Sequence, residues 1–368
     1  MIKNEIAVIG GGFYGLWISE KLIRNGNKVT LFERESELMI GASRINQARI
    51  HAGHHYARSI KTFSSSNRNY SKFLADFDES IFHTKFNIYL MEKNSMTSID
   101  KFIRLNGLFD SKLVDLPNEI AKEFNRDRIK QGWLVDESFY NSNKLRDLFK
   151  NLFNSSNFEY KLECNVTKLR SLEDKVNLES TINSETKQEI YDGAIVSTYG
   201  NFEMLENKEE LSKFFKYEVC EIINVEVPSK FKNIAITVID GPFWSLTPWP
   251  TFGNHALTHV RYTPHAVCNT YGEAGKTIEF IEKNSNFAFM KNEISKYCSE
   301  LSNIRYIKSH FVVKSVSRGV EANDSRSIFF NTNFDKNILT ILGGKIDNIY
   351  DIEDVIVDFI ARLGVKNV

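Results

Sequence analysis

A glycine-rich turn between two short apolar runs constrains the fold of this chain more than any other feature. The runs lie at 5–9 and 28–32, and the glycines that follow the first are Gly10, Gly12 and Gly15. In a strand–helix–strand unit the first glycine permits a tight turn, the second lets a pyrophosphate approach the backbone, and the third lets helix and strand pack closely. The helix N-terminus offers free N–H groups to the phosphates. The pattern predicts a βαβ unit that binds a dinucleotide.

An acidic residue at the end of the second run indicates which dinucleotide fits. Glu33 can accept hydrogen bonds from both hydroxyls of a ribose, and its charge would repel a 2′-phosphate. FAD or NAD is therefore favoured over NADP. Phe13 and Tyr14, in the expected first helical turn, and Arg34, after the acid, are further candidates for cofactor contacts.

Length, charge and cysteine content exclude several kinds of partner. The 368 residues include 47 Lys plus Arg and 47 Asp plus Glu, so no net field favours nucleic acid or acidic membranes. No apolar run approaches the ~20 residues of a membrane span. The four cysteines form no C-x-x-C pair, and no familiar metal-ligand spacing is present, so we expect reduced thiols and no metal. Because the first strand begins close to Met1, we expect no targeting peptide and a cytoplasmic protein.

Hydrophobic patterning beyond the glycine turn predicts alternating helices and strands in a chain long enough for two domains. The predicted helices are 16–25, 65–76, 143–153, 276–301 and 351–363. The predicted strands include 85–91, 133–135, 158–169, 176–180, 188–190, 191–196 and 338–342. The segment 219–264 is strand-like and aromatic, with prolines that disfavour helix.

Three separated segments together resemble the FAD-dependent D-amino-acid-oxidase-like superfamily. They are the glycine turn through Glu33, the loop 41–56 with Asn46, His51 and Tyr56, and the turn Gly343-Gly344-Lys345-Ile346. The loop is most similar to the L-2-hydroxyglutarate oxidase branch, which carries an Asn, a His-x-Gly and a Tyr at similar spacing. The central region resembles no family that we can name.

The resemblance implies an α/β fold, with a Rossmann-type FAD-binding domain and a second, antiparallel-sheet (α+β) substrate domain. The FAD-binding domain would be discontinuous and consist of 1–84, 143–215 and 310–368. The substrate domain would consist of 85–142 and 216–309.

The resemblance also implies FAD as cofactor and assigns residues to it along its length. The ADP half would lie against the glycine turn and Glu33. The remaining contacts would come from Ser43, Arg44 and Asn46 near the pyrophosphate, Val166 at the adenine, Thr198 and Gly200 beside the nucleotide, and Gly343, Gly344, Lys345 and Ile346 at the N1/C2 edge of the flavin.

Four residues are candidates for the chemistry. His51 or Tyr56 could face the flavin as a substrate-binding group or proton acceptor. Alternatively, His51 is covalently attached to FAD, or the histidines of this loop are structural. On a strand, Arg261 would share with His259 a face that could line the substrate cavity, where Arg261 could grip a carboxylate or phosphate; it could equally face solvent. The resemblance implies a substrate-carboxylate contact for Arg318, because many relatives place an arginine there, although the usual proline-containing continuation is missing from this sequence. The aromatic segment 243–249 could roof the flavin or belong to the core.

Three functions compete at this point. The first is an FAD-dependent oxidoreductase that removes a hydride from a C–H bond next to an amine or hydroxyl of a small polar substrate, such as an amino acid, a hydroxy acid, or an amino or nucleotide sugar. The second is a non-redox, flavin-dependent sugar-nucleotide mutase or isomerase. The third is an inactive binding module, whose flavin cavity would be filled by Trp or Phe side chains. Substrate identity, electron acceptor and oligomeric state stay open.

Overall fold

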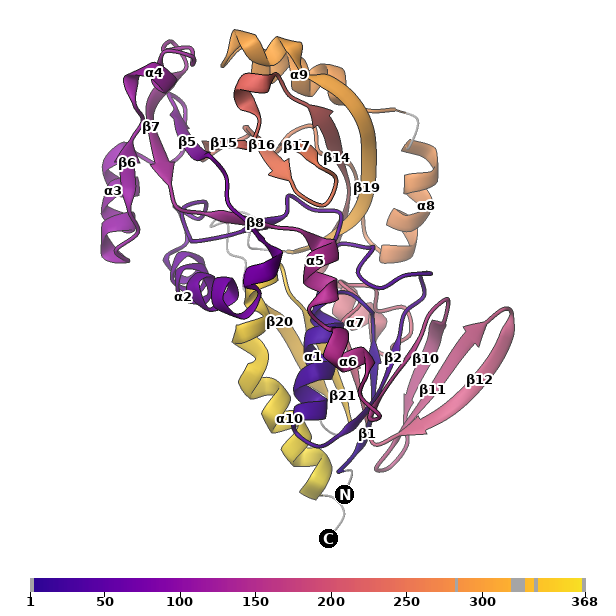
Figure 1. Cartoon of the computed structure of the whole chain (residues 1–368). Helices are drawn as coiled ribbons and strands as arrows, with labels where there is room; N and C mark the ends of the chain where they lie inside the picture. The colour runs from indigo at the N-terminus through magenta and orange to yellow at the C-terminus, as the bar shows by residue number, and fades with distance from the viewer. Residues whose placement is uncertain (1–2, 282–283, 319–327, 334–336, 366–368) are drawn as a thin grey trace.

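The computed structural model describes residues 3–281, 284–318, 328–333 and 337–365. Two large sheets organise them, one in the lower and one in the upper half of Figure 1. The lower sheet has six strands in the order β20 (Phe329–Asn333), β21 (Ile338–Leu342), β13 (Gly193–Val196), β1 (Glu5–Ile9), β2 (Lys28–Phe32) and β9 (Phe158–Lys161). All neighbours are parallel except β20 and β21. The predicted α/β fold class is confirmed.

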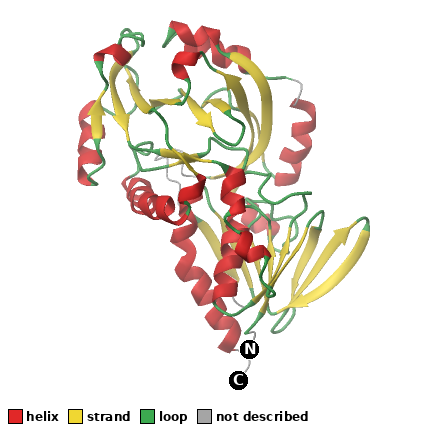
Figure 2. Ribbon diagram, viewed as in Figure 1, coloured by secondary structure: helices red, strands yellow, loops and turns green. Residues whose placement is uncertain are grey.

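Side-chain alternation along β1 explains how the lower sheet is covered on both faces. Ile6 and Val8 point into a core shared with the helices, whereas Ala7 and Ile9 point into a separate core on the opposite face. The helical cover consists of α1 (Phe13–Arg24) and α10 (Glu353–Val365), which lie in front of the sheet in Figure 2. The opposite cover is an antiparallel sheet of β10 (Asn165–Ser171), β11 (Val176–Ile182) and β12 (Glu185–Tyr191).

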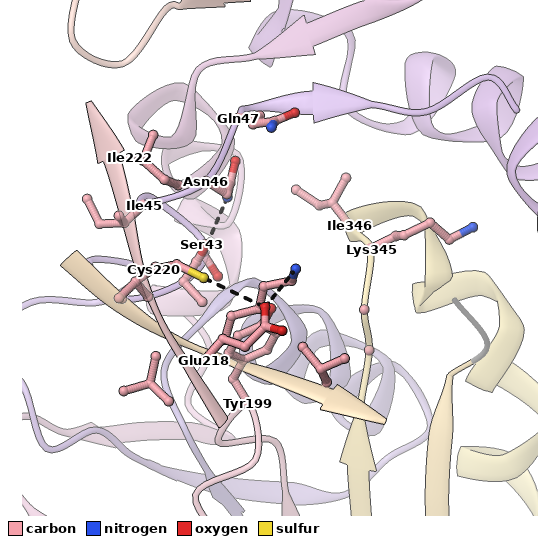
Figure 3. A pocket seen from close by; sticks show the side chains of 18 of the residues that line it. Ser43, Ile45, Asn46, Gln47, Tyr199, Glu218, Cys220, Ile222, Lys345 and Ile346 are labelled. Atoms are coloured by element: carbon pink, nitrogen blue, oxygen red, sulfur yellow. Dashed lines mark hydrogen bonds and ion pairs between the residues drawn. The ribbon is translucent and has the colours of Figure 1, made fainter. Parts of the chain in front are cut away.

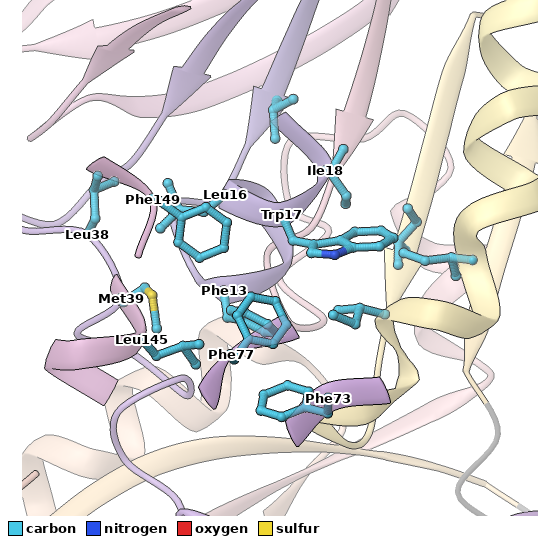
Figure 4. Packing of buried hydrophobic residues seen from close by; sticks show 14 of the residues in the cluster. Phe13, Leu16, Trp17, Ile18, Leu38, Met39, Phe73, Phe77, Leu145 and Phe149 are labelled. Carbon is cyan, nitrogen blue, oxygen red and sulfur yellow. The ribbon is translucent and has the colours of Figure 1, made fainter. Parts of the chain in front are cut away.

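Aromatic residues join α1 to the helices beside it. The Phe13 ring lies 5.8 Å from Phe73, 5.3 Å from Phe77 and 6.1 Å from Phe149, measured between centroids. Figure 4 shows these rings packed together with Leu16 and Trp17. Phe73 lies in α2 (Ile60–Asp76) and Phe77 directly follows it, whereas Phe149 lies between α5 (Ser142–Asp147) and α6 (Lys150–Phe153).

The upper sheet is larger and mostly antiparallel. Its strands run in the order β18 (Pro264–Cys268), β14 (Phe215–Glu226), β17 (Asn254–His259), β16 (Trp244–Trp249), β15 (Ile234–Ile239), β5 (Phe86–Glu92), β7 (Ile129–Val135) and β6 (Leu113–Asp115). The long strand β19 (Arg305–Ser317) pairs with the other edge of β14. Only β15 and β5 run parallel within this sheet.

Smaller elements complete the described chain. A short sheet joins β3 (Arg49–Ile50), β8 (Ser138–Tyr140) and β4 (Ile81–Phe82). The remaining α-helices are α3 (Ile99–Leu108), α4 (Asn118–Ala121), α7 (Lys208–Ser212), α8 (Tyr271–Ile281) and α9 (Phe287–Ser295). Short 3₁₀ helices lie at Asp78–Ser80, Ser229–Phe231, Ser299–Asn303 and Ile346–Ile352. No helix among the described residues is both long and apolar enough to cross a membrane.

Three predicted elements are interrupted. The helix predicted over 143–153 is split into α5 and α6, since buried Phe149 leaves helical geometry between them. The helix predicted over 276–301 is replaced by α8, α9 and a 3₁₀ turn, and α9 begins where Asn286 N–H donates to the buried carboxylate of Glu221 at 2.9 Å. The strand predicted over 158–169 is divided between β9 and β10, because Glu163 adopts a positive φ of 51°.

The predicted domain ranges remain a prediction. One predicted boundary, at residue 310, falls inside β19, whose pairing with β14 extends on both sides of that position. The six-stranded sheet and the β10–β11–β12 sheet lie entirely within the predicted FAD-binding domain. The short β3–β8–β4 sheet mixes the two predicted domains, because β8 comes from the predicted substrate domain.

His255 on β17 generates a prediction for stability. Its side chain is buried, its Nε2 lies 3.2 Å from the carbonyl oxygen of Ile234, and burial lowers its pKa to about 4. The unfolded chain therefore binds a proton near the usual pKa of about 6.5 that the folded chain does not. The contribution of His255 to the free energy of unfolding is fully present above that pH and is lost as the pH falls towards 4. The loss amounts to roughly 3 kcal/mol.

We expect His255→Gln to flatten this pH dependence, because the amide stays neutral and can still donate to Ile234. The measurement is the free energy of unfolding of both proteins at pH 7.5 and at pH 4.5. Every other titrating group is common to both proteins and cancels in the difference. Equal losses of stability in the two proteins would contradict the prediction.

Candidate active site

A cavity of about 1170 Å³ is lined by both large sheets and by the loop that follows β2. Fourteen of the residues predicted to contact the cofactor line it: Gly10, Gly12, Phe13, Tyr14, Glu33, Arg34, Ser43, Asn46, Val166, Thr198, Gly343, Gly344, Lys345 and Ile346. Three others do not, namely Gly15, Arg44 and Gly200. Among the candidates for chemistry, His51 and Tyr56 line the cavity.

The glycine turn brings α1 close to β1 and places the N-terminus of α1 at the cavity wall. Gly10 has a φ of 107°, and a Cβ on Gly15 would lie 1.9 Å from the Gly10 carbonyl oxygen, so a side chain is excluded there. Gly12 begins α1 without a side-chain cap of its own. Ser43 Oγ accepts the Phe13 N–H at 2.9 Å, and therefore joins the 41–48 loop to this turn.

The carboxylate of Glu33 lies at the same end of the cavity. Its Oε2 accepts the Gly11 N–H at 2.7 Å, and its Oε1 accepts the Glu35 N–H at 2.9 Å. Burial raises the pKa of Glu33, and these two N–H groups oppose the rise. Each oxygen keeps a further lone pair for a hydroxyl donor.

Arg34 and α8 close this end of the cavity. Arg34 Nη2 donates to the hydroxyl of Tyr271 at 3.2 Å, and Tyr271, the first residue of α8, lines the cavity. Val166 lines the same cavity from β10.

Asn46 holds the shape of the loop after β2 rather than leaving its amide free. Its Nδ2 donates to the Ala42 carbonyl at 2.8 Å and to the Tyr140 hydroxyl at 2.6 Å, and its Oδ1 accepts the Ala48 N–H at 2.5 Å. Tyr140 in turn donates to the Ser43 carbonyl at 3.0 Å. Figure 3 shows Ser43 and Asn46 on the opposite side of the cavity from the turn after β21.

Arg44 and Gly200 do not line the cavity and instead contact other parts of the protein. The Arg44 guanidinium lies 5.3 Å from the centroid of the Phe252 ring. Gly200 has a φ of 91°, and a Cβ there would lie 2.1 Å from Ser315 Oγ, so it shapes the turn after β13. Thr198, in the same turn, donates its hydroxyl to the Asn201 carbonyl at 2.5 Å.

The turn after β21 contacts α1 directly. Tyr14 donates its hydroxyl to the Lys345 carbonyl at 2.7 Å, and a Cβ on Gly343 would lie 1.9 Å from that hydroxyl oxygen. The Lys345 ammonium donates to Ser66 Oγ at 2.6 Å and lies 3.3 Å from Asp347 Oδ2. Its side chain is thereby held among other protein groups, while its backbone stays at the cavity wall.

This contact predicts a contrast between two adjacent glycines. Gly343→Ala should displace the Tyr14 ring, cost about 1–3 kcal/mol of stability and weaken FAD binding about tenfold or more. Gly344→Ala is the matched control, because a Cβ there meets nothing within 4 Å. Thermal unfolding and titration of each apoprotein with FAD measure both effects. The same FAD affinity in the two variants would be inconsistent with the contact.

His51 lies at the cavity wall among other titratable groups. Its ring centroid is 5.4 Å from that of His55 and 5.1 Å from that of Tyr56. Its Nδ1 is buried and lies 3.4 Å from Glu137 Oε1, while 17% of its side chain is exposed. The Nε2 side of the ring is therefore the side that the cavity can reach. His54, by contrast, is buried with its Nδ1 2.6 Å from Asn106 Oδ1.

Arg261 and Arg318, predicted as substrate anchors, lie outside the cavity lining. Strand β17 ends at His259, so the expected alternation does not continue, and Arg261 is exposed. The Arg318 guanidinium is also exposed, and donates to the Phe215 carbonyl at 2.8 Å and to Asn269 Oδ1 at 2.9 Å. The prediction that these side chains grip a substrate does not fit their positions.

The aromatic segment is divided between cavity and core. Phe243 and Trp244 line the cavity. Trp249 is completely buried, 4.4 Å from Phe252 and 5.1 Å from His310 between ring centroids. The cavity is therefore open, unlike the filled cavity that an inactive binding module would have.

Several polar residues of the site were not found from the sequence. Asp240 accepts from Arg58 Nε at 2.9 Å, and both line the cavity. His259, by contrast, lies on a strand face that the sequence predicted could line the cavity; it lines the cavity, and burial lowers its pKa to about 4, so the ring is neutral. Glu137 lies behind His51. The pair Asp136-Glu137 directly after the strand at 129–135 is a signal that could have identified it.

Comparisons with known proteins agree with this geometry. The FAD dependent oxidoreductase (DAO) family model matches residues 5–337, and the chain belongs to this family. A protein described as FAD-dependent monooxygenase FPY4, from Fusarium mangiferae, is 25% identical over 94% of this chain and 88% of its own length. The family relationship makes the protein an FAD-dependent oxidoreductase whose cofactor is FAD.

Two solved structures share the fold over nearly the whole chain. Glycine oxidase from Geobacillus kaustophilus has a TM-score of 0.69 at 12% identity, over 100% of this chain and 95% of that one. L-α-glycerophosphate oxidase from Mycoplasma pneumoniae, with FAD bound, has a TM-score of 0.69 at 14% identity, over 99% of this chain and 95% of that one. At such identities the similarity concerns the fold alone.

Proposed function

We propose that this oxidoreductase removes a hydride from a C–H bond next to an amine or hydroxyl of a small polar substrate. The position of His51 carries the proposal. Its Nδ1 is turned towards a buried carboxylate, and the rest of its ring lies at the wall of the cavity that contains the glycine turn. An imidazole held in this way can accept a proton from a substrate. The spacing of Asn46, His51 and Tyr56, which resembles the L-2-hydroxyglutarate oxidase branch, supports a hydroxyl-bearing substrate.

The residues present fit FAD along its length. The open N-terminus of α1 would hold the pyrophosphate, Glu33 would bind the ribose, and the backbone of Gly343 and Gly344 would contact the flavin edge. A side chain at Gly10 or at Gly343 would collide with neighbouring protein atoms and distort the cavity. FAD, when bound, supplies the two-electron acceptor for the hydride.

The protein groups would move the proton and orient the substrate. As the C–H bond breaks, the O–H or N–H proton passes to His51 Nε2, and a C=O or C=N double bond forms in the substrate. Tyr56 and neutral His259 offer polar contacts, and Phe243 and Trp244 offer apolar cover. The paired side chains of Arg58 and Asp240 add a dipolar group to the same wall.

Anaerobic absorbance spectroscopy tests the proposal. The FAD-loaded protein is mixed with a panel of 2-hydroxy acids, amino acids and amino sugars, and the flavin band near 450 nm is followed. Bleaching by a member of the panel, with the matching oxidised product, is expected. Isomerisation that needs prior reduction but consumes no reductant would instead favour the sugar-nucleotide mutase alternative.

The relative from Fusarium mangiferae supports a second candidate function. Its description as a monooxygenase supports oxygen insertion as the alternative reaction of this chain. An oxidase would form one hydrogen peroxide per substrate, without an external reductant. A monooxygenase would require a reductant such as NADPH and would transfer an atom from ¹⁸O₂ to its product. Mass spectrometry of the product distinguishes the two.

A substitution at His51 tests its role with the compound that bleaches the flavin. His51→Gln should slow flavin reduction by about 10²–10⁴-fold, the usual range for loss of a general base. His83→Gln is the control, since His83 lies near Ser138 but does not line the cavity. The absorbance spectrum must show that FAD is retained in both. An unchanged rate in His51→Gln would remove the proton-transfer role.

A further inference from the structure

We propose that Glu137 is a positioning residue that fixes the tautomer of His51, with the proton on Nδ1 and the lone pair of Nε2 towards the cavity. The tautomer of His51 follows from the structure of this chain and does not depend on the proposed function. Its consequence for turnover depends on the proposed function, in which His51 Nε2 accepts the substrate proton.

Strand pairing brings Glu137 behind His51. In the antiparallel pair of β3 and β8, Ile50 lies opposite Ser138, so the next residue in each direction faces the other. Glu137 Oε1 accepts the Ala52 N–H at 3.0 Å and lies 3.4 Å from His51 Nδ1. This separation is long for a hydrogen bond but leaves no room for another group between the two atoms. His51 Nδ1 has no closer partner within the described part of the chain.

The other carboxylate oxygen of Glu137 is held by three strands. Glu137 Oε2 accepts the Tyr89 hydroxyl at 2.7 Å and lies 3.2 Å from Arg49 Nη1. Arg49 also donates to the Tyr89 hydroxyl at 2.7 Å and to Thr237 Oγ1 at 2.6 Å. Tyr89 and Thr237 are direct neighbours in the parallel pair of β5 and β15, so one face of the sheet presents both. The carboxylate therefore has a fixed position.

Charge and burial make the Glu137 carboxylate a hydrogen-bond acceptor. Burial alone would raise its pKa, but the charge of Arg49 and the interaction with His51 hold the pKa below its ordinary value. The side chains of Arg49 and Glu137 are 1% and 0% exposed, so bulk water does not screen the pair. An ionised carboxylate only accepts hydrogen bonds. The His51 nitrogen that faces it must therefore carry the hydrogen.

The other groups around His51 do not supply a competing acceptor of this strength. His55 and Tyr56 face the ring from the same loop, and the Lys345 ammonium lies 5.3 Å from the Tyr56 ring centroid. His54 is turned to Asn106, and burial lowers its pKa. A buried carboxylate behind a histidine also stabilises the imidazolium that forms when the ring takes a proton.

Nitrogen-15 NMR of the FAD-loaded protein, labelled at histidine, tests the tautomer without a substrate. His51→Gln identifies the His51 resonances. In the wild type at neutral pH we expect a pyridine-type resonance for Nε2 and a pyrrole-type resonance for Nδ1. Glu137→Gln should move the pyridine character to Nδ1 or average the two, because its amide can donate towards the ring. A pyridine-type Nδ1 in the wild type, or an unchanged spectrum in Glu137→Gln, would overturn the proposal.

Two further variants separate positioning from loss of structure. Glu137→Asp keeps the charge beside Arg49 but withdraws it from His51, and it replaces Glu137→Gln if the latter does not fold. It should likewise weaken the tautomer preference. Tyr89→Phe removes a hydrogen bond from the other carboxylate oxygen and should leave the His51 spectrum as in the wild type. A shift in Tyr89→Phe as large as in Glu137→Gln would indicate a general structural effect and would contradict a specific role.

Kinetics distinguish failure of this inference from failure of the proposed function. If His51 acts as base under the control of Glu137, Glu137→Gln alone should slow flavin reduction. In a protein that already carries His51→Gln, the same substitution should slow flavin reduction little further. Independent, multiplicative losses would refute control through His51. An unaffected rate in His51→Gln would refute the proposed function while the NMR result for the tautomer still stands.

Discussion

The close approach of α1 to the turn after β1 sets the position of every other part of the cavity. Gly10 and Gly15 bring strand and helix so near that a single added carbon would collide with the Gly10 carbonyl. This places the free end of α1 beside Glu33 and brings Tyr14 within hydrogen-bond distance of the turn after β21. The nucleotide end of the cavity thus combines the N-terminus of a helix with a carboxylate, which suits recognition of a phosphate- and ribose-containing cofactor.

The part of the cavity wall around His51 is supported by buried charged side chains. There a buried ion pair, Arg49 with Glu137, also forms hydrogen bonds with the hydroxyl groups of Tyr89 and Thr237. A buried ion pair is weak evidence of stability, since the cost of removing both charges from water offsets much of their attraction. Its presence at the cavity wall, which Arg49 lines, is better explained by the orientation that it imposes on His51.

Local signals made the nucleotide half of the fold predictable. The strand–glycine–helix–strand order and the acid after it lie within 33 residues, and the structure forms β1, α1 and β2 there. The network behind His51 was not predictable in this way, because β3, β5, β15 and the β7–β8 turn meet only in three dimensions. The interruption of the 276–301 helix has a similar cause, since Glu221, on a remote strand, binds the backbone where α9 begins. Arg318 had a suitable neighbourhood in sequence, but the backbone of β14 uses its donors.

The contact between Tyr14 and Lys345 joins residues 331 positions apart in the chain. During synthesis the glycine turn leaves the ribosome long before its partner does. A nascent polypeptide can therefore fold its first βαβ unit while one side of the coenzyme channel is still missing. Full enclosure of the flavin end must wait until Lys345 has been synthesised.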